Sequence, residues 1–299
     1  MKKFSKLLTI VLAITMLFTV CLVGCSEDKP PESNYNQVDT LNDKTTAQIY
    51  SDIMNTIDAY ENNFTSTVNY DIPCSVSVSG ASLTMNLKMY DTFKMAGDNF
   101  YEKIFVDAGE IMGESLGTIT NEVWFVNNVA YIDMRDEITP QTIKAKYSAT
   151  LQEIAIRAEL DMDELLNPVY DFSQSDFDDV VFNINKTDAT DIYFEIVMDG
   201  AKAQAFAQKV ASKNLPTDAT LEYGKINYKF IIDETGALDH IDISFKVKMT
   251  TPDATYNYTY NGEITFTDIG TTQVSAPTDA DAFTDITASL PPLETTPVE

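Results

Sequence analysis

The chain has 299 residues and a formal net charge of −26, from 46 acidic and 20 basic side chains. Hydrophobic residues make up 44% of it and aromatic residues 11%, which is too rich for a disordered acidic chain and predicts a packed core. The acidic excess excludes nucleic-acid binding as the main activity, because the chain offers no basic stripe to displace counterions from phosphates. One His and three Cys leave few groups for a metal site or a nucleophile, so we expect no metal, no cofactor and no enzymatic activity.

The N-terminus has the parts of an export signal. Three lysines precede an apolar run over residues 7–23, and the composition turns polar directly after Cys25. The tetrad Leu-Val-Gly-Cys over residues 22–25 resembles the lipobox of bacterial lipoproteins. The resemblance implies removal of residues 1–24, a diacylglyceryl group on the Cys25 sulfur, and anchoring of the protein on the extracytoplasmic face of the cell membrane. The alternative is an uncleaved anchor, for which this run is at the short limit.

The mature chain divides into a tether, a domain and a tail. Residues 25–44 are polar and contain adjacent prolines, so we interpret them as a flexible tether. Residues 45–283 are long enough to form one domain with a sizeable core, and the Thr-, Pro- and Glu-rich residues 284–299 are interpreted as a disordered tail. With Cys25 lipidated, Cys74 has no disulfide partner and is predicted to be a small apolar core residue.

Apolar residues alternate with polar ones through much of the domain, which is typical of strands with one buried face. The pattern favours an antiparallel sheet over a doubly wound parallel one. Asn127 and Asn128 predict a tight hairpin turn, and Gly80 and Gly236 mark two others. The strands that the alternation predicts most clearly cover residues 68–78, 83–89, 116–126, 194–198, 226–232, 241–249 and 256–266.

Helical periodicity occurs three times. It predicts a first helix from near Lys44 to Tyr60, a longer one over 147–166 that ends before Pro168, and a short one over 201–210. The predicted fold class is therefore α+β, with a one-sided antiparallel sheet of about ten strands whose apolar face is covered by about three helices.

Element order and two segments carry a resemblance to a known family. Residues 122–133 are similar to a hairpin of the LolA/LppX-like proteins, and residues 264–277 resemble their closing strand. The resemblance implies a strongly curved, incomplete antiparallel barrel over residues 45–283, with helices in its concave side. Many members hold acyl chains of lipoproteins or glycolipids between sheet and helices. The family provides no residue-level ligand motif to transfer.

Residues 113–117 match the G-x-S-x-G pattern of hydrolases, with Ser115 as the nucleophile and His240 following in triad order. That motif requires a helix directly after the serine, whereas residues 116–126 predict a strand. We therefore interpret the motif as a loop, and His240, beside Asp239 near a turn, as an exposed histidine without a catalytic role.

Two further segments have alternative interpretations. Residues 159–179 contain eight acidic side chains and no basic one, which favours a solvated acidic face and leaves a weak calcium site as the alternative. Residues 107–118 contain three glycines, which favour a mobile loop or, in a functional reading, a lid over a cavity.

The leading functional hypothesis is a non-catalytic, membrane-anchored carrier or holder of a hydrophobic ligand. The alternative is an accessory module of the cell envelope that recruits a protein partner or cations through its acidic surface. The sequence names neither the ligand nor a partner. The residues predicted to line a ligand cavity are Met85, Met89, Trp124, Phe245, Tyr256, Tyr258 and Phe266.

Overall fold

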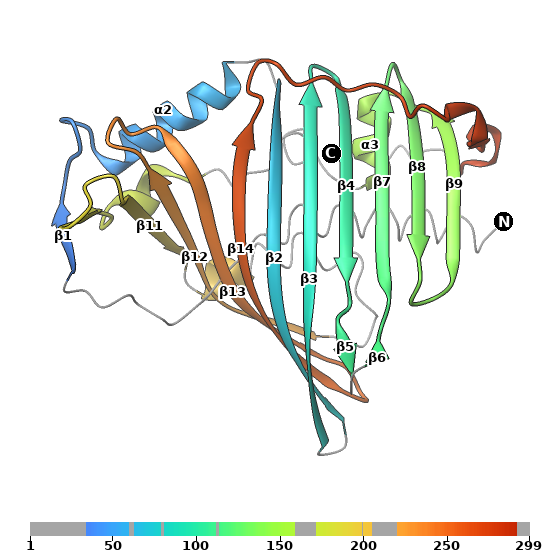
Figure 1. Ribbon diagram of the computed structural model, residues 1–299, viewed down its shortest axis with the longest axis horizontal. Coiled ribbons are helices and arrows are strands. Elements are labelled where there is room, and N and C mark those ends of the chain that lie inside the picture. Colours follow the sequence, from blue (N-terminus) through green and yellow to red (C-terminus); the bar gives the residue numbers. More distant parts are fainter. Residues whose placement is uncertain are drawn as a thin grey trace, which may run out of the picture.

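One sheet of thirteen strands organises the chain (Figure 1), in the order β1-β10-β11-β12-β13-β14-β2-β3-β4-β7-β8-β9-β15. The structure is a computed structural model that describes residues 34–59, 63–78, 81–111, 114–158, 172–198, 200–204 and 220–291. The strands of this sheet are β1 (Tyr35–Val38), β2 (Asn63–Val78), β3 (Ala81–Ala96), β4 (Asn99–Asp107), β7 (Thr118–Val126), β8 (Val129–Asp136), β9 (Gln141–Ser148), β10 (Phe182–Asn185), β11 (Ile192–Met198), β12 (Thr220–Ile232), β13 (Leu238–Thr250), β14 (Thr255–Thr267) and β15 (Thr284–Asp285).

The predicted fold class is wrong in three respects. Strands dominate the described residues, so the protein is mostly β and not α+β. The sheet has thirteen strands where about ten were predicted, and it is mixed because β15 runs parallel to β9. It is also not one-sided, since an aromatic side chain of the C-terminal segment packs on its outer face. The missed strands are the short ones, which offer too few residues for alternation to be recognised.

Two of these short strands lie where the sequence predicted a tether and a tail. β1 falls within residues 25–44 and pairs with β10, and β15 falls within residues 284–299. Ordered structure in the described residues therefore extends on both sides of the predicted domain 45–283.

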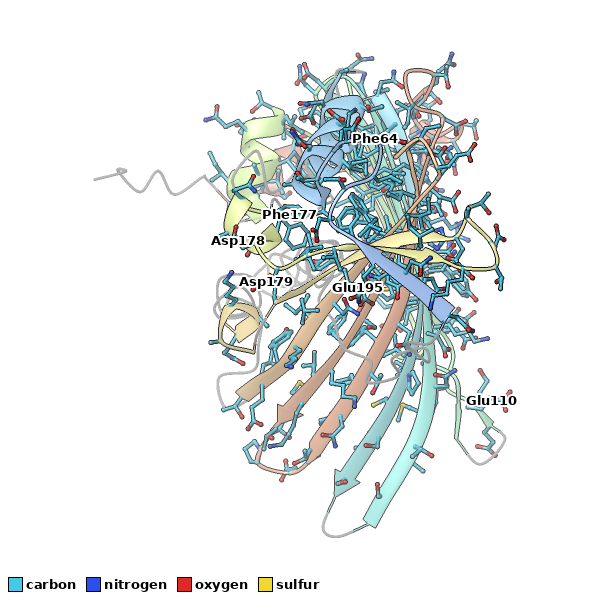
Figure 2. The ribbon with its side chains drawn as sticks, turned by 90° about the vertical axis from the view of Figure 1, so that its left-hand side faces the viewer. Phe64, Glu110, Phe177, Asp178, Asp179 and Glu195 are labelled. Carbon is cyan, nitrogen blue, oxygen red and sulfur yellow. The ribbon has the colours of Figure 1, made fainter. Side chains whose placement is uncertain are left out.

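The strand predictions within the domain are otherwise confirmed, and the register places their apolar residues on one face, which we call the inward face. A row of directly paired residues crosses ten strands of this face: Phe194, Phe230, Ile241, Ile264, Val68, Asp91, Ile104, Asn121, Met134 and Ile143. Eight of the ten are apolar, and all ten are buried. Rows like this one form the core, where Phe64 and Phe177 lie among the side chains drawn in Figure 2.

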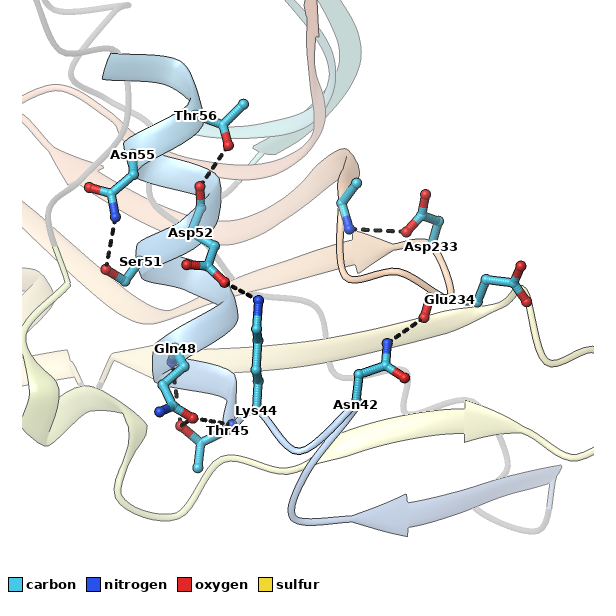
Figure 3. A network of polar contacts seen from close by, with 11 residues as sticks. Asn42, Lys44, Thr45, Gln48, Ser51, Asp52, Asn55, Thr56, Asp233 and Glu234 are labelled. Atoms are coloured by element: carbon cyan, nitrogen blue, oxygen red, sulfur yellow. Dashed lines mark hydrogen bonds and ion pairs between the residues drawn. The ribbon is translucent and has the colours of Figure 1, made fainter. Parts of the chain in front are cut away.

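Helix α2 (Thr46–Asp58) confirms the first predicted helix. Its N-cap is Thr45, whose hydroxyl accepts from the Gln48 backbone N–H in a capping box (Figure 3). The isoleucines at positions 49, 53 and 57 are buried, as the period predicted, and Tyr50 packs its ring on Phe230. Asn42, just before the helix, donates to the carbonyl of Glu234 (2.8 Å), which ties this end of α2 to the β12–β13 turn.

The other predicted helices agree in part. Helix α3 (Leu151–Ala158) begins later than predicted, because Tyr147 belongs to β9; residues 159–166 of that prediction lie outside the described residues. Residues 200–204 are helical, and the rest of the third prediction also lies outside them. No helix in the described part of the chain is long and apolar enough to cross a membrane.

The C-terminal segment runs along the ends of the strands from β14 to β9 (Figure 1). There Phe283 packs its ring against Trp124 and Tyr131 on the outer face of the sheet, with the Lys144 ammonium 4.8 Å from the ring centroid. The Ile286 backbone N–H donates to the carbonyl of Lys146 in β9. Phe283 is the last residue of the predicted domain, and the Ile286 hydrogen bond fixes a residue that the sequence assigned to the tail.

Candidate ligand-binding face

The structure divides the seven predicted lining residues between the two faces of the sheet. Six lie on the inward face: Met89 and Phe245 are buried in its core, and the other four are half-buried. Trp124 lies on the outer face, where its ring meets those of Tyr101 and Phe283. The inward residues are Met85, Met89, Phe245, Tyr256, Tyr258 and Phe266.

At the end of the sheet near the β2–β3 hairpin, the inward face carries apolar side chains that are only half-buried. They form two adjacent cross-strand rows over β12, β13, β14, β2 and β3. We call these half-buried residues the apolar strip: Leu221, Met249, Tyr256, Val76 and Leu83 in one row, and Tyr223, Tyr258 and Met85 in the next.

The apolar strip continues directly into the core. Tyr258 lies opposite Cys74, and burial raises the pKa of both side chains above their usual values. Tyr260, two residues along β14, stacks on Phe245 with ring centroids 3.9 Å apart. Pro73, which has no N–H, lies where direct pairing of β2 with β14 is interrupted. The strip is thus an apolar surface that is partly exposed to solvent near the β2–β3 hairpin and continues into the buried core at its other end.

Three polar side chains lie inside the apolar core of the same face. Asp91 in β3, Glu102 in β4 and Asn121 in β7 are 4%, 6% and 3% exposed. Asp91 and Asn121 both pair with Ile104, from opposite sides, and Glu102 is on the next inward position of β4. We call these residues the buried polar trio.

Two members of the buried polar trio, Asp91 and Asn121, have polar atoms that the protein leaves without a hydrogen bond. Both the amide oxygen and the amide nitrogen of Asn121 lack a hydrogen-bond partner, as does one carboxyl oxygen of Asp91. In the described residues, no basic side chain forms an ion pair with either acid. Unsatisfied buried polar groups each cost about 1–3 kcal/mol, so a native structure normally keeps them only for a reason.

Burial controls the ionisation of the two acids. It raises the pKa of Asp91 to about 7. Burial, followed by the neighbouring charge of Asp91, raises the pKa of Glu102 well above its usual range. The pair therefore holds its protons to higher pH than exposed acids do.

Sequence reasoning missed this trio, although a signal was present. Asp91 occupies an apolar position of the alternation, between Met89 and Phe93, and Glu102 stands likewise between Phe100 and Ile104. An acid at an inward position of a long strand identifies a candidate site, because charged residues are rarely fully buried without a partner.

Among the described residues, a cluster of side chains of the types that bind metal ions lies on the outer face. His240 and Asp242 in β13 and Glu263 in β14 place one donor atom each within 4.8 Å of one another. The His240 Nδ1 lies 2.8 Å from the Asp239 carboxylate, which leaves Nε2 towards Asp242 at 3.5 Å. The sequence singled out His240 but could not predict that strand pairing brings Glu263 beside it.

Two other segments that the sequence singled out are the Ser115 motif and the acidic stretch 159–179. Ser115 is exposed in the two-residue strand β6 (Glu114–Ser115), which pairs with β5 (Glu110–Ile111), and its hydroxyl accepts from the Gly117 N–H. Strand β7 follows, where a hydrolase motif would need a helix. Of the acidic stretch, residues 159–171 lie outside the described residues, and Asp176 pairs with Lys202.

A separate, open hollow of about 560 Å³ lies near β10 and β11, next to the Asn42–Glu234 contact of Figure 3. Its lining is mixed polar and apolar, and it shares no residue with the apolar strip or the buried polar trio.

Comparison with known proteins gives no family. No family model matches the chain, and no curated protein matches it. The solved structures that are similar to it include the ywiB protein of Bacillus subtilis (7% identity, TM-score 0.20, covering 68% of this chain and 95% of that one) and a DUF1329 family protein of Desulfovibrio piger (11%, 0.21, 73% and 89%). They also include an exported protein with a YmcC-like fold from Bacteroides fragilis (8%, 0.18, 67% and 93%). At these TM-scores we transfer neither fold family nor function from them.

Proposed function

We propose that this protein is an extracytoplasmic lipoprotein, anchored through Cys25, that binds an amphipathic ligand along the inward face of its sheet. The observation that supports this most is the apolar strip, whose tyrosine, methionine and leucine side chains are half-buried and continuous with the core. Contiguous apolar surface of this kind commonly serves a ligand or partner, because leaving it in water is unfavourable.

The chemistry of the apolar strip suits flexible chains. Methionine adapts its shape to irregular ligands, and tyrosine offers an apolar ring with a polar edge. The resemblance of the sequence to the LolA/LppX-like group supports the same function, since many members of that group hold acyl chains on the corresponding face.

The anchor and the charge fit this role. Two acyl chains on Cys25 would hold the protein at a membrane more firmly than one chain could. The net charge of −26 would keep the domain soluble and away from anionic lipid headgroups, so that ligand exchange would take place at the strip and not through adsorption of the whole domain.

Native mass spectrometry of delipidated protein, incubated with membrane lipid extract, tests the proposal. We expect the mass of a bound lipid to return. Met85→Glu, which places a charge in the apolar strip, should abolish the adduct. The matched control is Thr84→Glu, because Thr84 directly precedes Met85 in β3, is exposed, and faces the other side of the sheet. No adduct with the parent protein, or equal loss in both variants, would contradict the proposal.

The anchor is tested separately by metabolic labelling with a radioactive fatty acid. The parent chain should incorporate the label and remain in the membrane fraction, and Cys25→Ser should do neither. A labelled Cys25→Ser variant would contradict lipidation at this residue.

The acidic interaction module remains the alternative. Lysines stand among the acids on the outer face, where Lys103 pairs with Glu122 and Lys248 with Glu222, so charge there is mixed. A partner captured in pull-downs at low salt, lost at high salt and indifferent to Met85→Glu, would favour this module over lipid binding.

A further inference from the structure

We infer that the buried polar trio of Asp91, Glu102 and Asn121 binds a protonated amine, and that the ligand of the inward face is therefore a cationic amphiphile. This inference rests on the proposed function and names the chemical class of the ligand. It starts from the position of the trio, which lies on the same face of the sheet as the apolar strip.

The geometry suits one small group with several hydrogen-bond donors. Asp91 and Asn121 are two strands apart, on either side of Ile104, which places their Cα atoms about 10 Å apart. Glu102 lies on the intervening strand, one inward position away. Three oxygen acceptors thus surround one point of the apolar face. An ammonium group has three donors and no acceptor, so it can pair with one oxygen from each residue.

In the described part of the chain, no charged side chain pairs directly with the trio, so a positive charge that compensates the two acids would come from the ligand. The residues that pair directly with the trio on adjacent strands are Val68, Phe93, Ile104, Val123 and Met134. None of them is charged, and no basic side chain of the described residues pairs with the trio. Two adjacent carboxyls without a cation keep protons, whereas a bound ammonium would allow both to ionise and would exchange with the protons they hold.

Other headgroups fit less well. A phosphate or carboxylate would face two acids, no basic side chain and a protein of net charge −26. A hydroxyl could accept from a protonated carboxyl, but the bond would be one between neutral groups and weaker than the charge-assisted bonds of an ammonium. A cation is the headgroup class that satisfies the acceptors and the electrostatics together.

The position along β3 sets how such a ligand would lie. Met85 belongs to the apolar strip, and Asp91 is three inward positions farther along the same strand. At about 3.3 Å per residue, the two sites are about 20 Å apart, which is the length of an extended chain of some sixteen carbons. The amine would enter the core and the tail would leave along the strip.

Isothermal titration calorimetry with three probes of equal chain length tests the inference: dodecylammonium and dodecanoate, each below its micellar concentration, and dodecanol below its solubility limit. We expect dodecylammonium to bind roughly ten- to hundredfold more tightly than dodecanol, as charge-assisted hydrogen bonds contribute, and dodecanoate to bind more weakly than dodecanol. Titrations at pH 7 in two buffers of different ionisation enthalpy should show proton release with dodecylammonium alone.

Matched variants separate the trio from the acidic surface. The double variant Asp91→Asn, Glu102→Gln keeps the shapes but removes both charges, so it should bind dodecanol as before and lose the preference for the amine. Glu122→Gln, on the outer face of β7, should keep it. Equal binding of amine and alcohol by the parent, or a preference that survives in the double variant, overturns the inference and leaves the proposed function standing. Absence of binding by all three probes overturns both.

Discussion

Replacing Asp91 by Asn should stabilise the protein at neutral and alkaline pH. The folded chain holds the pKa of Asp91 at about 7, against an ordinary value of 3.8, because burial disfavours the charged form. Each pKa unit corresponds to 1.36 kcal/mol, so the shift costs the native state about 4 kcal/mol once the carboxyl has ionised in both states. Asn has nearly the same shape and no charge to bury.

The sign of the pH dependence follows from proton binding. Between about pH 4 and pH 7 the unfolded chain has lost the Asp91 proton and the folded chain retains it, so stability falls as pH rises through this interval. Below pH 4 both states are protonated, and parent and variant should be nearly equal. Above pH 7 the variant should exceed the parent by about 4 kcal/mol.

Urea unfolding followed by circular dichroism, at pH values from 4 to 8, measures this difference. Asp71→Asn serves as the control, because Asp71 lies on the exposed side of the neighbouring strand β2. A difference between Asp91→Asn and the parent that does not change with pH would refute the reasoning, as would a variant that is less stable throughout.

Three other variants test packing and capping. Phe283→Ala should uncover Trp124, the only tryptophan, and shift its fluorescence emission to longer wavelength; an unchanged spectrum would contradict the docking of the C-terminal segment. Gly262→Ala should cost about 1–3 kcal/mol in chemical unfolding, because its Cβ would lie 2.3 Å from the buried Tyr70 ring, whereas Gly224→Ala meets nothing closer than 3.6 Å and should change stability less. Thr45→Ala should cost about 1 kcal/mol by the same assay through loss of the α2 cap, and no measurable loss would count against the capping box.

The long strands and α2 could be predicted because their apolar residues repeat with a clear period. The side of the sheet on which an aromatic residue lies could not be predicted where that residue stands in a continuous apolar run. Trp124 stands in the run from Val123 to Val126, where alternation gives no direction. Its outward orientation depends on the register with β8 and on cover from Phe283, more than 150 residues away in the sequence. A contact between residues so far apart cannot be predicted from the pattern of a short segment.

The short edge strands were missed for a different reason. β1 and β15 are held by backbone pairing with β10 and β9, and their own side chains contribute little pattern. The acids of the buried polar trio occupy apolar positions of the alternation, and the sequence shows this. That the three residues are neighbours on one face follows only from the register of β3, β4 and β7.

The pairing of β2 with β14 has a consequence for how the protein is made. Val68 lies directly opposite Ile264, so the centre of the sheet joins residues from near the two ends of the chain. During synthesis one edge of β2 must remain without its neighbour until nearly the whole polypeptide has emerged, and such distant contacts form slowly. A chain with this topology cannot complete its sheet while it grows, which would suit the export across a membrane that we propose for it.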